Sequence, residues 1–151
     1  MNATKKRALK SLLVLLILLT LCFIWGNSLM NAERSSQFSN GLFDVLRPLM
    51  NDLGLHPEDD LGLRDLAHLA EFGALGAELA LLFLLERGLC AAVFRKSAIL
   101  SLLTAVVDEL LQLIGDRAAQ LIEVGLDFLG ACLGMAIIWL IAVCVKKKRN
   151  Q

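Results

Sequence analysis

Residues 122–145 read IEVGLDFLGACLGMAIIWLIAVCV, an apolar run with only two ionisable side chains, Glu123 and Asp127, both near its start. A helix that rises about 1.5 Å per residue needs roughly 20 residues to cross a hydrocarbon core about 30 Å thick. Three further runs of this kind lie at residues 8–25, 66–85 and 97–114. We therefore predict an all-α integral membrane bundle of four transmembrane helices, forming a single domain over residues 1–151.

The composition also indicates a membrane protein. Apolar residues make up 57% of the 151 residues and charged residues 20%, with a mean hydropathy of +0.66. In soluble domains, apolar residues make up about 45–50% and charged residues about 25%. A soluble protein this small could not bury so much apolar surface. The formal net charge is zero, which leaves no basic surplus for phosphates, so we expect no nucleic-acid partner.

The distribution of basic residues predicts the orientation. Lysines and arginines gather before the 8–25 helix, between the 66–85 and 97–114 helices, and after the 122–145 helix. Lys and Arg near the ends of membrane helices are retained on the cytoplasmic side. The connection at residues 26–63 is acidic instead and is expected outside. The sequence thus predicts a multi-pass protein with both termini in the cytoplasm.

The outer connection carries a helical pattern of its own. Between residues 35 and 53, apolar side chains recur at steps of three and four: Phe38, Leu42, Val45, Leu46, Leu49 and Leu53. This spacing predicts a short amphipathic helix lying on the outer leaflet, which Pro48 would kink or end. The alternative is a loop with accidental periodicity.

Polar side chains inside the predicted helices are the main functional signal. An ionisable group at the centre of a membrane helix costs roughly 2.5–3.5 kcal/mol on insertion scales, so it normally faces the bundle interior. The outer ends of three helices carry or adjoin nine such polar residues: Arg64, His68, Glu71, Asp108, Glu109, Gln112, Arg117, Glu123 and Asp127. Counting along the helices places Glu71, Asp108 and Asp127 each about 10 Å below the outer boundary. We expect a polar cluster in the outer half of the bundle and almost wholly apolar inner halves; the alternative is polar glue between helices.

Small residues and cysteines carry less specific signals. Gly130 and Gly134 form a small-xxx-small step, which is typical of close helix packing, and a homo-oligomer through this stripe is a further hypothesis. The four cysteines have neither disulfide nor zinc spacing. Glu78 lies deeper than the other acids and has no assigned partner. We assign no metal ligand and no cofactor.

The order of these residues resembles the VanZ-like family. The matching elements are Asn27-Ser28, Arg64-x-x-x-His68-x-x-Glu71, Asp108-Glu109-x-x-Gln112 with Arg117, and Asp127-x-x-Gly130-x-x-x-Gly134. The resemblance covers roughly residues 23–135, and its most specific part is Asp-Glu-x-x-Gln followed by Arg. Many relatives have a second serine where this chain has Asn27. The resemblance implies a protein of the bacterial plasma membrane, in a family associated with low-level teicoplanin resistance.

Two functions are compatible with these residues. In the first, Arg64 and Arg117 bind an anionic outer-leaflet headgroup, because the planar guanidinium can bond two phosphate oxygens. The partners would be membrane lipids, a lipid-linked envelope precursor or a lipoglycopeptide. In the second, the protein is an intramembrane hydrolase or transferase acting on a lipid-linked substrate. His68 would be its general acid or base, with Asp108, Glu109 and Asp127 as partners or ligands of a divalent cation. The chain lacks a zinc-type histidine pair, a nucleophile elbow and a phosphate loop, so we favour binding and assign no catalytic residue.

Overall fold

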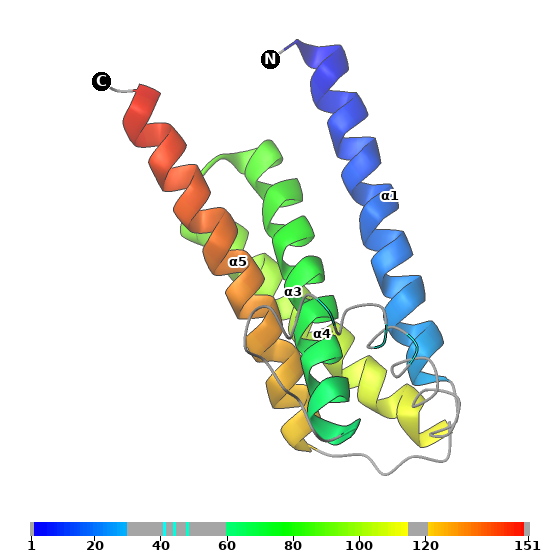
Figure 1. The fold of residues 1–151 in the computed structure, drawn as a ribbon. Helices are drawn as coiled ribbons and strands as arrows, with labels where there is room; N and C mark the ends of the chain where they lie inside the picture. The colour runs from blue at the N-terminus through cyan, green and yellow to red at the C-terminus, as the bar shows by residue number, and fades with distance from the viewer. Residues whose placement is uncertain are drawn as a thin grey trace.

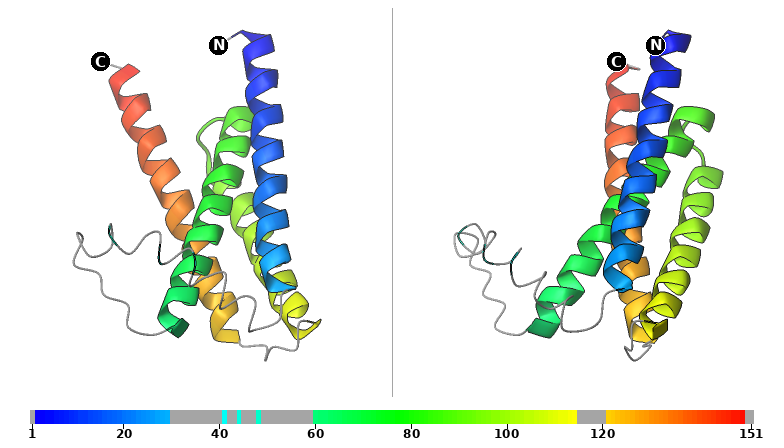
Figure 2. Two further views of the ribbon diagram at one scale, coloured as in Figure 1. Left: turned by 45° about the vertical axis from the view of Figure 1, so that its right-hand side comes forward. Right: turned by 90° about the vertical axis from the view of Figure 1, so that its right-hand side faces the viewer.

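The computed structural model describes residues 2–29, 41, 44, 48, 60–114 and 121–149. Four long helices make up this part of the chain: α1 (Ala3–Ser28), α3 (Asp60–Arg87), α4 (Ala91–Ile114) and α5 (Leu121–Arg149). Successive helices run in opposite directions, so that both termini and the α3–α4 turn lie at one end of the bundle (Figures 1 and 2). The predicted all-α bundle is confirmed. The predicted amphipathic helix at residues 35–53 lies outside the described residues, apart from positions 41, 44 and 48.

Each of the four helices is long and apolar enough to span a membrane. They extend beyond the predicted apolar runs: α3 begins at Asp60 rather than at residue 66, and α4 begins at Ala91 rather than at residue 97. The chain turns between α3 and α4 at Gly88, whose φ of 71° suits a residue without a side chain. The basic side chains Arg95 and Lys96 then lie within the helix, where their alkyl stems can follow the apolar surface.

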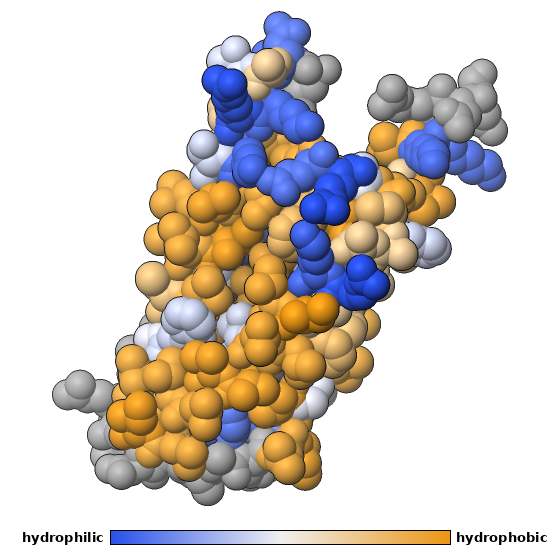
Figure 3. Space-filling model, turned by 180° about the vertical axis from the view of Figure 1, so that it is seen from behind, coloured by the Kyte–Doolittle hydropathy of each residue, from blue (hydrophilic) through white to orange (hydrophobic). Residues whose placement is uncertain are grey.

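The outer surface of the bundle is apolar over most of its length. Large hydrophobic side chains point away from the core, for example Leu103 and Trp139, which are 57% and 46% exposed. Hydrophilic residues gather at the end that holds the termini (Figure 3), where Lys10 of α1 forms an ion pair with Glu86 of α3. This distribution is typical of a bundle surrounded by lipid with one basic end.

Helices α3 and α5 meet backbone to backbone. A Cβ atom on Gly134 would collide with the backbone oxygen of Gly73, and one on Gly130 would collide with the backbone of Leu69. We call Gly73, Gly130 and Gly134 the glycine seam. Small residues allow membrane helices to approach this closely. Gly130 and Gly134 of α5 are therefore covered by α3 of the same chain.

Next to the seam lies a small hydrophobic core. Ile24, Phe72, Leu75, Ala105 and Ala131 are almost completely buried and come from all four helices. Phe72 and Leu75 lie one and two turns beyond His68 on α3, on the side toward the chain termini. The core therefore closes off the inner side of the polar residues that follow.

Candidate functional site

Buried polar side chains from all four helices meet at the end of the bundle opposite to the chain termini. Their exposed fractions lie between 0% and 7%. They are Ser28 of α1, His68 of α3, Asp108, Glu109 and Gln112 of α4, and Asp127 of α5. Polar groups buried at this density need partners among themselves or in a ligand.

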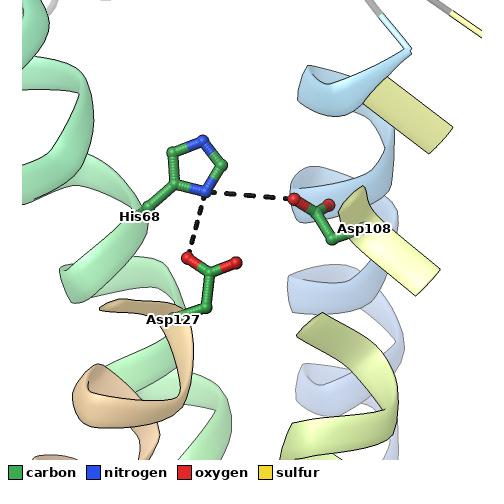
Figure 4. Close-up of side chains that lie close together, drawn as sticks. All are labelled: His68, Asp108 and Asp127. Carbon is green, nitrogen blue, oxygen red and sulfur yellow. Dashed lines mark ion pairs between the residues drawn. The ribbon is translucent and has the colours of Figure 1, made fainter. Parts of the chain in front are cut away.

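His68 lies between two aspartates that come from different helices. Its Nδ1 atom is 3.3 Å from Oδ1 of Asp127 and 3.9 Å from Oδ2 of Asp108. Both carboxylates therefore lie around the same ring nitrogen (Figure 4). The three side chains are at most 5% exposed. We call His68, Asp108 and Asp127 the His68 cluster. One ligand-type atom from each of its members lies within 4.8 Å of the other two.

Asp108 is held in place by two hydrogen bonds. The hydroxyl of Ser28 donates to Oδ1 at 2.6 Å, and the side-chain amide of Gln112 donates to Oδ2 at 3.1 Å. Hydrogen bonds to an ionised acceptor are among the stronger ones in proteins. The carboxylate of Asp108 is thus fixed in the orientation that faces His68.

Arg64 continues these contacts toward the surface. Its Nη2 atom donates to Oε1 of Gln112 at 3.1 Å and forms an ion pair with Glu123. The contacts therefore run without interruption from Ser28 through Asp108, Gln112 and Arg64 to Glu123, and they include one or more residues of every helix. We call this chain of contacts the four-helix network. The side chain of Arg64 is 24% exposed, so the network ends at a partly open position.

Two of the nine predicted residues are described by the structure but belong to neither group. Glu71 interacts electrostatically with all three members of the His68 cluster, and its buried Oε2 atom has no hydrogen-bond partner. Glu109 is buried beside Asp108 on α4. Arg117 lies outside the described residues.

The expectation of almost wholly apolar inner halves is wrong. Ser97 and Ser101 are completely buried on α4, and Glu78 on α3 accepts a hydrogen bond of 3.1 Å from the hydroxyl of Thr20. A serine is small and can bond to its own helix, as Ser97 does to the carbonyl of Val93, so its burial costs little. The signal was present in the spacing, because residues 97, 101, 108 and 112 fall on one face of a helix.

A protein-family model described as VanZ/LLP1 matches residues 13–142. The chain belongs to the VanZ-like family. The matched range includes every residue of the His68 cluster and of the four-helix network, and the resemblance found in the sequence is confirmed. No curated protein and no solved structure matches the chain in the same comparisons.

In this VanZ-like protein, acids outnumber bases at the end of the described helices that lies opposite to the chain termini. The buried and half-buried carboxyl groups are Glu71, Asp108, Glu109, Glu123 and Asp127, and the basic groups are Arg64 and His68. Neighbouring buried carboxylates cannot all remain ionised without compensating positive charge. The chemistry of the site therefore favours a cation, a proton or both in addition to the two basic side chains.

Proposed function

We propose that this VanZ-like protein binds an anionic headgroup of the outer leaflet at the partly open position of Arg64. The proposal rests on the hydrogen bonds and the exposure of the Arg64 guanidinium. Glu123 and Gln112 hold its Nη2 atom, and the side chain as a whole remains 24% exposed. A guanidinium has five N–H donors in a planar fork and can bond phosphate oxygens through a second edge.

The proposal places the protein in the bacterial plasma membrane with both termini in the cytoplasm. The gathering of hydrophilic residues at the end that holds the termini supports this orientation (Figure 3). The His68 cluster and Arg64 then face the outer leaflet, which displays lipid-linked envelope precursors. Teicoplanin carries an acyl tail and acts at the same leaflet, so headgroup binding there would contribute to cell-envelope function or to glycopeptide resistance.

Lipid binding to the purified protein tests the headgroup proposal. The protein is titrated in detergent with short-chain phosphatidylglycerol and with phosphatidylcholine, and affinities are compared between wild type and Arg64→Gln. We expect wild type to prefer phosphatidylglycerol and Arg64→Gln to lose about tenfold in affinity for it, the loss of one charge-assisted contact. Arg95→Gln, which removes an arginine at the opposite end of the bundle, is the matched control. Equal affinities for wild type and Arg64→Gln would refute the role of Arg64.

The link to antibiotics is tested in cells. A glycopeptide-sensitive host expresses wild type, Asp108→Asn, His68→Ala or Arg117→Gln at matched levels, and growth is measured in teicoplanin and in vancomycin. Higher teicoplanin tolerance with wild type and its loss in the variants would support the resistance role. Unchanged tolerance in every strain would remove that role and leave lipid binding to be judged separately.

The contact between His68 and Asp127 supports a second candidate function, an intramembrane hydrolase or transferase acting on a lipid-linked substrate. A histidine held by a carboxylate is a common general acid or base. Release of inorganic phosphate from a short-chain polyprenyl diphosphate distinguishes the two functions. Turnover that is lost in His68→Gln would indicate an enzyme, whereas binding without turnover that weakens with salt would indicate the first function.

A further inference from the structure

We propose that His68, Asp108 and Asp127 bind one divalent transition-metal ion, Zn²⁺ or Mn²⁺. The first argument is geometric. Two ligand atoms about 2.1 Å from a metal ion and at a tetrahedral angle lie about 3.4 Å apart. The distance from Nδ1 of His68 to Oδ1 of Asp127 is 3.3 Å, and that to Oδ2 of Asp108 is 3.9 Å. All three ligand-type atoms lie within 4.8 Å of one another, and the two carboxylates face the same side of the histidine ring (Figure 4).

The second argument is the lack of hydrogen bonds at His68 and Asp127, whereas Oδ2 of Asp108 accepts a hydrogen bond from Gln112. Nδ1 of His68 and Oδ1 of Asp127 are buried 3.3 Å apart without the geometry of a hydrogen bond, and Oδ2 of Asp127 is buried without a hydrogen-bond partner. The two side chains are 5% and 1% exposed, and burying polar atoms of this kind without partners costs free energy. A metal ion between these atoms would satisfy them together.

A protonated histidine explains the arrangement less well. The Nδ1 atom carries one hydrogen, which can point toward only one of the two carboxylates, although both lie around the same nitrogen. A divalent ion binds both carboxylates and the nitrogen at once. It also supplies two positive charges at a position where carboxylates outnumber basic side chains in the described helices.

The ligand set indicates the class of metal. Imidazole suits Zn²⁺ and other transition ions, whereas Mg²⁺ and Ca²⁺ prefer oxygen ligands alone. Ser28 holds the other oxygen of Asp108 through a 2.6 Å hydrogen bond, in the way that outer-shell groups orient metal ligands. Three protein ligands leave at least one coordination position for a water molecule or a substrate oxygen. The inference does not depend on headgroup binding by Arg64, because the metal alone can be tested.

Metal binding to the full-length protein tests the proposal. The protein is purified in detergent without a polyhistidine tag, stripped with EDTA and titrated separately with Zn²⁺, Mn²⁺ and Mg²⁺ by calorimetry. Bound metal per chain is then measured by mass spectrometry. We expect about one Zn²⁺ or Mn²⁺ per chain and much weaker binding of Mg²⁺. His68→Ala and Asp127→Asn should weaken binding by at least about 100-fold, the upper end of the effect of outer-shell partners.

Two matched variants separate a specific site from general effects. His56→Ala removes the other histidine of the chain, and Glu78→Gln removes a membrane carboxylate of α3 outside the cluster. Both should bind metal as wild type does. Ser28→Ala should weaken binding by about tenfold, since it removes an outer-shell partner. Circular dichroism and gel filtration establish that each variant is folded.

Substitution with Co²⁺ gives a second, spectroscopic readout, which is measured only on variants that are shown to be folded. A Co²⁺ ion in a site with one nitrogen and two carboxylate ligands should give visible absorption bands in wild type and in His56→Ala. The bands should be missing in His68→Ala. Less than about one-tenth equivalent of bound Zn²⁺ and Mn²⁺ in wild type, or equal binding by wild type and Asp127→Asn, would overturn the proposal.

Discussion

Helices α3 and α5 contact each other in two adjacent regions of opposite character. At the glycine seam the two backbones touch, and no side chain separates them. A few residues away, the ring of His68 and the carboxylate of Asp127 lie between the same helices, 3.3 Å apart. The seam fixes the spacing of the helices, and that spacing sets the distance between His68 and Asp127. A rigid apolar contact therefore determines the geometry of a polar one.

The largest loss of stability is expected when the glycine seam is disrupted. Gly134→Val places side-chain atoms where the backbone oxygen of Gly73 lies, so the helices must separate. We expect the free energy of unfolding, measured by SDS titration in mixed micelles, to fall by about 3 kcal/mol or more. Gly125→Val on the same helix is the control, because nothing lies within 4 Å of a Cβ atom there. Equal stability of the two variants would show that the seam is not tightly packed.

A smaller loss of stability is expected when the carboxylate of Asp108 is removed from the four-helix network. Asp108→Ala leaves the hydroxyl of Ser28 and the amide of Gln112 without the acceptor that they share. The same titration should show a loss of about 2–3 kcal/mol, the cost of leaving buried donors unsatisfied. Asp108→Asn keeps one carbonyl acceptor and should recover part of this loss. If Asp108→Ala is as stable as wild type, the four-helix network does not stabilise the bundle.

The isolated hydrogen bond between Thr20 and Glu78 should contribute less to stability than the glycine seam or the four-helix network. Thr20→Val removes the donor to Glu78 while it keeps the size of the side chain. The free energy of unfolding should fall by about 0.6 kcal/mol, the average for a hydrogen bond between membrane helices. Thr104→Val is the control, since the hydroxyl of Thr104 bonds only to the carbonyl of Leu100 in its own helix. A loss as large as that of Asp108→Ala would mean that polar contacts stabilise both halves equally.

The smallest change in the free energy of unfolding is expected at the end of the bundle that holds the chain termini. Lys10 and Glu86 form an ion pair whose side chains are 50% and 35% exposed. Lys10→Gln should change the free energy of unfolding by no more than about 0.5 kcal/mol, because exposed ion pairs contribute little. Comparing low and high salt checks the cause, since only the wild type should weaken with salt. A loss above about 1 kcal/mol would place this pair among the structural contacts of the bundle.

The sequence predicts the helices well because long apolar runs have few alternatives. It also predicts that Asp108 and Asp127 lie at one depth, because depth follows from counting residues along each helix. It could not assign contacts across helices, which depend on the rotation of each helix about its axis. Ser28 is the clearest example: its position at the end of α1 was evident, but its bond to Asp108 required the packed bundle. The partner of Glu78 was missed for the same reason.

The beginning of α4 was misplaced for a different reason. Hydropathy marks the lipid-exposed part of a helix, whereas the helix itself continues to the turn at Gly88. Arg95 and Lys96 lower the local hydropathy without interrupting the backbone hydrogen bonds. Apolar runs therefore define the membrane-embedded length and underestimate the helical length.

The four-helix network also constrains how the chain is made. Ser28 is separated by 80 residues from Asp108, and Arg64 by 59 residues from Glu123. At a synthesis rate of about 5–20 residues per second, Ser28 waits roughly 4–16 s before its partner has been synthesised. During this interval the first helices must tolerate unpaired polar groups, and α5, synthesised after the other three described helices, brings Glu123, Asp127 and two glycines of the seam. The bundle can therefore close only after α5 has been synthesised, and a chain halted before α5 lacks the partners of His68 and Arg64 on that helix.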